Sequence, residues 1–170
     1  MVERQGDNLL FLRTDFCECK CSEKVINPIR IELFRDDVEA TGRRLTEYDF
    51  AEGKIASVRI FDREDDFEVS RSNYTKCFDY DMITDGLEIR TAEPGDYLVI
   101  DGAGHRKDVK DYFVNEKIPA YLRDEVLLFT DGSHVMWVPG YRISEYYKVT
   151  DKTKTIIEIS VTGGFPWEKK

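Results

Sequence analysis

The sequence predicts an α+β protein that is rich in short strands and has few, short helices. Apolar and polar residues alternate over many short segments, which is typical of strands with one buried face. The clearest is Thr155–Val161, which reads TIIEISV. The chain of 170 residues is 41% hydrophobic and 12% aromatic, enough to build the core of one ordinary domain.

Strands are expected wherever such alternation is bounded by turn residues. In Ile55–Phe61, for example, Ala56, Val58 and Ile60 alternate with the residues between them. An antiparallel or mixed sheet in a layered structure follows from the mixture of these strands with short helices. The predicted strands are Leu9–Phe16, Ile29–Phe34, Ile55–Phe61, Leu87–Arg90, Tyr97–Ile100, Val126–Thr130, His134–Val138 and Thr155–Val161.

Helical periodicity is limited to short stretches. The best is Lys107–Asn115, where Val109, Tyr112 and Phe113 repeat at helical spacing and form one apolar face. A second short helix is expected after Pro119, because the fixed φ of proline suits a first helical position. Residues 36–50 fit either a helix or a long loop.

Composition shifts near Thr84-Asp85-Gly86. Residues 1–85 form a strand-rich N-terminal part with 13 Lys and Arg against 20 Asp and Glu. Residues 86–170 are more densely patterned and hold 12 against 14. We interpret both parts as one continuous unit.

Charge and composition exclude several classes of protein. A net charge of −9 repels phosphate on average, so contact with a nucleic acid requires a local basic patch. No apolar stretch approaches the roughly 18 residues of a membrane helix, and the first residues lack an apolar signal core. We therefore expect a cytoplasmic protein that neither spans a membrane nor is secreted.

Three cysteines alternate in Cys17-Glu18-Cys19-Lys20-Cys21. Structural zinc sites use four ligands in a tetrahedron, usually two pairs from separate loops. The other candidate ligands, Cys77, His105 and His134, are far away in the sequence. We expect free, reduced thiols and no metal site.

Two segments resemble sites of other chemistry. Asp131, Ser133 and His134 contain the residue types of a hydrolase triad, but at one turn they cannot align in that order. The glycine-rich segment Asp101–Lys107 leads into the predicted helix without the ending of a nucleotide-binding loop. It fits either a phosphate site at the helix start or a plain strand-to-helix turn.

Residues 105–155 form a neutral island in the acidic chain, with nine Lys and Arg against eight Asp and Glu. Aromatic side chains are interleaved with these cations, a mixture that nucleic-acid surfaces use. They are Tyr112, Tyr121, Tyr141, Tyr146 and Tyr147.

Several blocks between Arg90 and Lys154 resemble the C-terminal domain of the bacterial tRNA(Ile)-lysidine synthetase family. The order and spacing of these blocks over about 65 residues carry the resemblance. Cys77–Asp81 is also similar to the stretch that leads into that domain, whereas residues 1–75 match by position alone. The blocks are RTAEPGD at 90–96, GHRKDVKDYF at 104–113, KIP at 117–119, RD at 123–124, DG at 131–132, WVPG at 137–140 and YRIS at 141–144.

The resemblance implies a fold shared with part of the beta subunit of phenylalanyl-tRNA synthetase. It also implies a parent ligase that uses ATP, with magnesium, to attach lysine to the wobble cytidine of the tRNA(Ile) with a CAU anticodon. That chemistry belongs to an N-terminal PP-loop domain, whose Ser-Gly-Gly-x-Asp-Ser motif is missing here, so we expect this chain to hold no cofactor and to perform no catalysis. The implied partners are the tRNA and the catalytic domain, and a homodimer is left open.

The resemblance implies that this domain binds and positions the tRNA. Ala120, and the pair Ala92-Glu93, stand where the family often has basic residues, which weakens the basic face. The alternative is a module that docks on the catalytic domain or a second subunit with little RNA contact. Tyr112, Phe113, Trp137 and Ile143 are assigned to the core. The candidate tRNA-binding residues are Arg90, His105, Arg106, Lys107, Lys110, Arg123 and Arg142.

Overall fold

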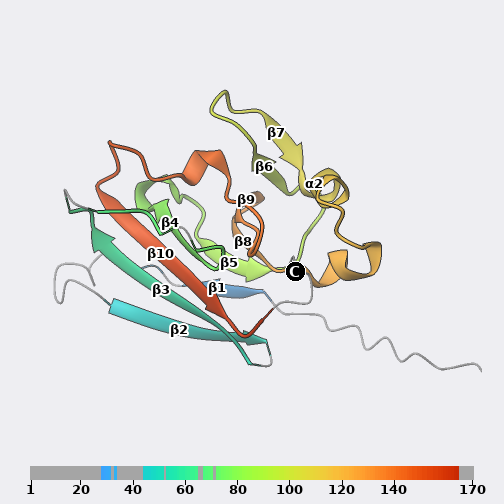
Figure 1. The fold of residues 1–170 in the computed structure, drawn as a ribbon, viewed down its shortest axis with the longest axis horizontal. Coiled ribbons are helices and arrows are strands. Elements are labelled where there is room, and N and C mark those ends of the chain that lie inside the picture. Colours follow the sequence, from blue (N-terminus) through green and yellow to red (C-terminus); the bar gives the residue numbers. More distant parts are fainter. Residues whose placement is uncertain are drawn as a thin grey trace, which may run out of the picture.

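Ten strands in two sheets make up most of the structure (Figure 1), which is a computed structural model. It describes residues 28–31, 33, 44–51, 53–64, 67–70 and 72–164. The predicted α+β class is confirmed, since the strands are accompanied by one short α-helix and three 3₁₀ turns. The strands are β1 (Ile29–Ile31), β2 (Arg44–Ala51), β3 (Lys54–Asp62), β4 (Thr75–Asp79), β5 (Leu87–Arg90), β6 (Tyr97–Val99), β7 (Arg106–Asp108), β8 (Leu128–Asp131), β9 (His134–Trp137) and β10 (Thr155–Thr162).

The smaller sheet is antiparallel, with the strand order β2-β3-β10-β4. Its central strand β10 pairs with β3 from Thr155↔Asp62 to Thr162↔Ile55 and with β4 from Ile156↔Asp79 to Ser160↔Thr75. On the face away from the core, Arg59 donates to Glu158 at 2.7 Å. The strand that comes last in the sequence therefore joins two strands from the first half of the chain.

The larger sheet has the strand order β1-β5-β8-β9-β6-β7. All its neighbours are antiparallel except β6 and β9, which run parallel and meet at Tyr97↔His134. Strands β8 and β9 are buried along their whole length, which places them at the centre of the molecule. The short, charged strand β7 forms one edge of the sheet, beside helix α2 (Figure 1).

One hydrophobic core joins the two sheets. Residues of β3 and β10, such as Val58 and Ile159, belong to the same buried cluster as Leu87 of β5 and Phe129 of β8. Rings from the two sheets meet where Phe78 of β4 packs against Trp137 of β9, with centroids 6.1 Å apart. Strands from both sides of residues 85 and 86 are present in each sheet.

The helices are short and lie outside the sheets. Helix α2 (Val109–Asn115) buries Val109, Tyr112 and Phe113, the three residues of the predicted apolar face. The 3₁₀ turns are η1 (Tyr80–Met82), η2 (Ala120–Glu125) and η3 (Glu145–Tyr147). The short helix predicted after Pro119 is η2.

Most of the predicted strands are present within one or two residues of their predicted ends, and Leu87–Arg90 agrees at both ends. Only residues 29–31 of Ile29–Phe34 form a described strand, and Leu9–Phe16 lies outside the described residues. The helix or loop expected at 36–50 is wrong for residues 44–50, which belong to β2. There Thr46 and Tyr48 are half-buried while Glu47 and Asp49 are exposed. Burial therefore alternates as in a strand, but one of the inward-facing residues is the polar Thr46, so the sequence shows no apolar alternation.

The predicted start of the long helix is also wrong. Residues 106–108 continue the sheet as β7, because they pair with β6. The helix starts only after Asp108, whose carboxylate accepts a hydrogen bond from the Lys110 backbone at 2.8 Å and caps the first turn. Lys107 therefore lies on a strand and Lys110 on the helix.

The carboxylate of Asp131 connects three separate segments inside the protein. It accepts hydrogen bonds from the backbone N–H groups of Thr84, Asp85 and Gly86 at 3.0, 2.6 and 2.9 Å. The buried hydroxyl of Tyr147 donates to it at 3.0 Å. Asp131 ends β8 and is 4% exposed, so these donors replace the water that a buried carboxylate loses. It fixes both the entry to β5 and the position of η3.

Replacing Asp131 with Ala will destabilise the protein strongly, by about 3 kcal/mol or more, because at least four donors lose their acceptor in a buried place. Asp131→Asn will cost less, since its amide oxygen still accepts some of these bonds. Urea unfolding followed by circular dichroism measures both. Asp151→Ala, at an exposed aspartate, is the control. A loss below about 1 kcal/mol for Asp131→Ala would contradict the role of this carboxylate.

Candidate nucleic-acid interface

The hairpin of β6 and β7 separates two adjacent candidate residues. Arg106 pairs with Val99 and Lys107 pairs with Leu98, and paired residues lie on the same face of a sheet. Arg106 and Lys107 therefore point to opposite faces of the larger sheet. The Arg106 face carries Tyr97 and Val99, whereas Leu98 on the Lys107 face is completely buried.

Lys107 and Lys110 lie where β7 meets α2. Lys110 is exposed, Lys107 is half-buried, and neither forms an ion pair with any described carboxylate. Lys117 follows α2 and is exposed as well. Residues 105–117 hold four Lys and Arg against three Asp and Glu, so this corner is close to neutral. Two ammonium groups that pair with no carboxylate of the described residues are therefore available to an anion.

The loop before β7 is built around one carboxylate. Asp101 Oδ1 accepts from the backbone N–H groups of Ala103 and His105, and Oδ2 lies 2.7 Å from His105 Nδ1. The hydrogen bond with His105 holds the pKa of Asp101 below its ordinary value. In the same way, the carboxylate of Asp108 accepts a hydrogen bond from the backbone N–H of Lys110 at the helix start. The structure therefore supports the plain turn rather than a phosphate site in this loop.

Arg90 is a structural residue in this fold. Its side chain is 6% exposed and forms two hydrogen bonds with Asp96, at 2.7 and 2.8 Å. The same guanidinium donates to the backbone carbonyls of Thr91 and Gly132. The hydrogen bonds with Asp96 raise the pKa of Arg90, so it stays charged. With its donors used inside the protein, Arg90 takes no part in the interface described below.

Two other candidate arginines also have partners within the protein. Arg123 donates from Nε to the backbone carbonyl of Ile118 at 2.9 Å. Arg142 donates to the carbonyl of Ile100 at 2.9 Å and lies 3.4 Å from Glu145. Arg142 lines a shallow cavity of about 590 Å³ in which Glu116 and Glu145 accompany the lysines. Its lining holds three cations against two carboxylates, and Glu145 pairs with both Arg142 and Lys148.

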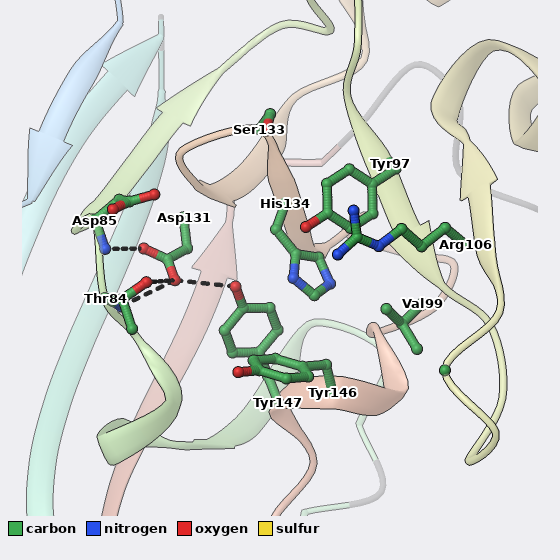
Figure 2. A pocket seen from close by; sticks show the side chains of 11 residues that line it. Thr84, Asp85, Tyr97, Val99, Arg106, Asp131, Ser133, His134, Tyr146 and Tyr147 are labelled. Carbon is green, nitrogen blue, oxygen red and sulfur yellow. Dashed lines mark hydrogen bonds between the residues drawn. The ribbon is translucent and has the colours of Figure 1, made fainter.

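Arg106 lines a smaller cavity of about 390 Å³ together with aromatic side chains (Figure 2). Its guanidinium lies over the ring of Tyr97, with 4.4 Å between the Cζ atom and the ring centroid. Arg106 is exposed and forms no ion pair with a described residue. It is the candidate arginine that combines a free charge with a concave surface.

His134 forms the centre of this cavity. Its ring stacks on Tyr97 with centroids 4.6 Å apart and packs against Tyr147 at 4.6 Å and Tyr146 at 5.1 Å. Ser144 Oγ lies 2.8 Å from His134 Nε2. Burial lowers the pKa of His134 to about 4, with Arg106 acting in the same direction and Asp131 opposing them. The imidazole is therefore neutral at pH 7.

The residues of the rejected triad lie together, but in a different arrangement. Asp131, Ser133 and His134 all line the cavity, and yet Asp131 bonds to Tyr147 and the serine that meets His134 is Ser144. Figure 2 shows Ser133 on the turn above His134, away from the bonded groups. Ser144, whose hydroxyl bonds to His134, is fully buried, and Asp131 bonds to Tyr147 instead of His134, so the described residues form no Ser-His-Asp triad in this cavity.

Sequence reasoning missed Tyr97 and Ser144 as parts of a site and noted Tyr146 only as one aromatic among several. Tyr97 and Tyr146 are 49 positions apart; the pairing of β6 with β9 brings Tyr97 to His134, and Tyr146 reaches the same ring from η3. No spacing in the sequence carries this information. The core assignment is confirmed for Tyr112, Phe113 and Trp137, while Ile143 is half-buried against the core.

The expectation of metal-free cysteines is tested only at Cys77. Burial raises the pKa of the Cys77 thiol to about 11, which keeps it protonated and unreactive. Cys17, Cys19 and Cys21 lie outside the described residues. Within the described ranges, no three His, Cys, Asp or Glu side chains gather as metal ligands, and no helix is long and apolar enough to cross a membrane.

Comparison with known proteins finds a family match in the second half of the chain. Residues 87–160 match the family described as TilS substrate C-terminal domain. The matched region begins at β5 and ends within β10, and includes the cavity residues Tyr97, Arg106 and His134.

Several curated proteins similar to this chain are named tRNA(Ile)-lysidine synthase. The protein from Clostridium tetani is 41% identical over 90 residues, which are 53% of this chain and 19% of that protein. One from Clostridium perfringens is 32% identical over 140 residues, 82% of this chain and 29% of that protein. The chain spans less than a third of the length of these relatives.

A solved structure named "Crystal structure of TILS C-terminal domain" shares the fold. It matches with a TM-score of 0.50 and 24% identity, over 62% of this chain and 82% of the other. The strand-rich architecture predicted from the sequence is thus also that of a known TilS C-terminal domain.

The buried, neutral His134 makes stability depend on pH. With a folded pKa of about 4 and an unfolded value near 6.5, the unfolded chain binds more protons between these limits. The stability present above pH 6.5 is therefore lost as the pH falls toward 4. Between pH 7 and pH 5 we expect His134 to account for a loss of about 2 kcal/mol.

Urea unfolding of the parent and of His134→Gln at both pH values measures this contribution. The variant will lose about 2 kcal/mol less than the parent on acidification. His105→Gln, at the other histidine of the chain, which is exposed, is the matched control for removal of an imidazole. Equal losses for the parent and His134→Gln would show that His134 titrates normally.

Proposed function

We propose that this chain binds and positions tRNA as part of a tRNA(Ile)-lysidine synthase. The observation that carries the proposal is the match of residues 87–160 to the TilS substrate C-terminal domain. Its curated relatives are named for an activity on tRNA(Ile). On this proposal the parent enzyme attaches lysine to the wobble cytidine of the CAU-anticodon tRNA(Ile) in the cytoplasm, with ATP and magnesium bound by a separate catalytic domain.

Lys107 and Lys110 are the proposed phosphate contacts. Both are without described ion-pair partners and lie at an edge strand and the adjoining helix, where an RNA backbone can approach. RNA stems are recognised mainly through phosphates and 2′-hydroxyls, so point charges suit this role. Exposed Lys117 follows the other end of α2, whereas Arg90, Arg123 and Arg142 support the fold around them.

The acidic balance of the chain limits the affinity that two lysines can provide. A net charge of −9 opposes RNA at long range, and salt screens both this repulsion and the local attraction. The domain is therefore proposed to add affinity and orientation to a tRNA that the catalytic domain also holds. Docking on that catalytic domain without RNA contact is the competing function.

A titration of the 170-residue chain with CAU-anticodon tRNA(Ile) at two salt concentrations tests the proposal. Binding will weaken as salt rises, because phosphate contacts release counterions. The double change Lys107→Ala and Lys110→Ala will weaken binding several-fold and make the plot of log K against log salt shallower by about 1 to 2.

The matched control changes Lys152 and Lys154 to Ala. These exposed lysines precede β10, in the loop at the opposite end of the molecule from α2 (Figure 1). Their loss will leave the salt slope within about 0.5 of the parent value. Absence of binding to the parent at low salt would favour the docking function instead, and an equal effect of both double variants would remove Lys107 and Lys110 from the interface.

A further inference from the structure

We propose that the cavity around His134 takes one unpaired nucleotide of an RNA, with the base among the tyrosines and the phosphate at Arg106. This deepens the proposed function and rests on it, because it names the part of the RNA that the domain reads beyond the phosphates of a stem.

The walls suit a flat aromatic ring. The ring of Tyr97 stacks on His134, Tyr147 packs against His134 at an interplanar angle of 55°, and Tyr146 packs edge-on against Tyr147 with centroids 5.0 Å apart. Tyr146 remains 46% exposed although it touches His134, so part of its ring is free at the cavity. Exposed aromatic faces next to a basic group are the means by which proteins bind single-stranded nucleic acid, because every base can stack.

The two ends of the cavity carry opposite charges. Figure 2 shows Arg106 at one end and Asp85 at the other, with His134 between them. The guanidinium of Arg106 keeps its N–H donors free of described carboxylates, so it can bind a phosphate. The carboxylate of Asp85 has no described hydrogen-bond partner, whereas the backbone N–H of this residue is bonded to Asp131. A carboxylate of this kind can accept a hydrogen bond from the amino group of a base.

Size and access restrict the ligand to a base that is not paired. Pockets that hold small molecules span roughly 300–1,000 Å³, and this cavity of about 390 Å³ lies at the lower end. A base pair within a duplex exposes neither face, because each is stacked on its neighbours. The cavity therefore selects a nucleotide from a single-stranded end, loop or bulge. It is separate from Lys107, which lies on the other face of the sheet.

Two RNA duplexes of identical sequence test the inference, one blunt and one with a four-nucleotide 3′ overhang of adenosine and cytidine. The parent chain will bind the overhang duplex about tenfold more tightly, the effect of one stacked base. Tyr146→Ala and Arg106→Gln will each remove most of this difference, and Tyr146→Ala will keep the affinity for the blunt duplex within about threefold. Tyr121→Ala, at a tyrosine that is 78% exposed on η2, is the matched control and will retain the difference.

A second measurement does not depend on duplex binding. Titration with AMP, CMP or inorganic phosphate is followed through the NMR signals of the His134 ring, assigned with His134→Gln. The nucleotides will shift these signals in the parent and not in Tyr146→Ala, and phosphate alone will shift them less.

The two proposals fail in different ways. Equal affinity of the parent for both duplexes, with no response of His134 to nucleotides, would overturn the nucleotide cavity and leave tRNA binding intact. Failure of tRNA and both duplexes to bind at low salt would overturn the proposed function, and a nucleotide-specific response of His134 would then still support the cavity.

Discussion

The requirement that a buried carboxylate be surrounded by donors organises the centre of this protein. Asp131 has lost nearly all contact with water, and its oxygens are occupied by amides of residues 84–86 and by the phenol of Tyr147. Burial and Asp131 together raise the pKa of Tyr147, so its hydroxyl remains a donor at physiological pH. One side chain thus sets where the chain enters β5 and where η3 lies, and both surround the cavity at His134.

The structure divides the cations of this acidic chain into two groups. Arg90, Arg123 and Arg142 stabilise turns and strand ends by donating to carbonyl and carboxylate oxygens. Arg106, Lys107 and Lys110 have no such carboxylate partners among the described residues. On the proposed function, the second group supplies the charges of the RNA surface on this chain of net charge −9. Neutral His134 adds aromatic surface without adding charge.

Local pattern predicted the strands well and the charged elements poorly. Leu87–Arg90 and Thr155–Val161 are apolar on at least one face, so their alternation is visible in the sequence. Residues 106–108 read RKD and become a strand only because β6 offers them a partner. The same limit applies to the site. The sequence does not distinguish Arg90, which is buried with Asp96, from Arg106, which lies over Tyr97, because these contacts depend on the tertiary fold.

The central place of β10 in the smaller sheet has a consequence for how the protein acquires its structure. β3 and β4 do not pair with each other, and they are joined into one sheet only when β10 (residues 155–162) pairs with both. β10 begins 76 positions after the end of β4. Closing so long a loop costs chain entropy before any pairing is gained, so the sheet forms late and slowly. During synthesis on the ribosome, both strands emerge with open edges that can pair with other chains. We therefore expect chains interrupted before β10 to aggregate rather than to form a smaller stable domain.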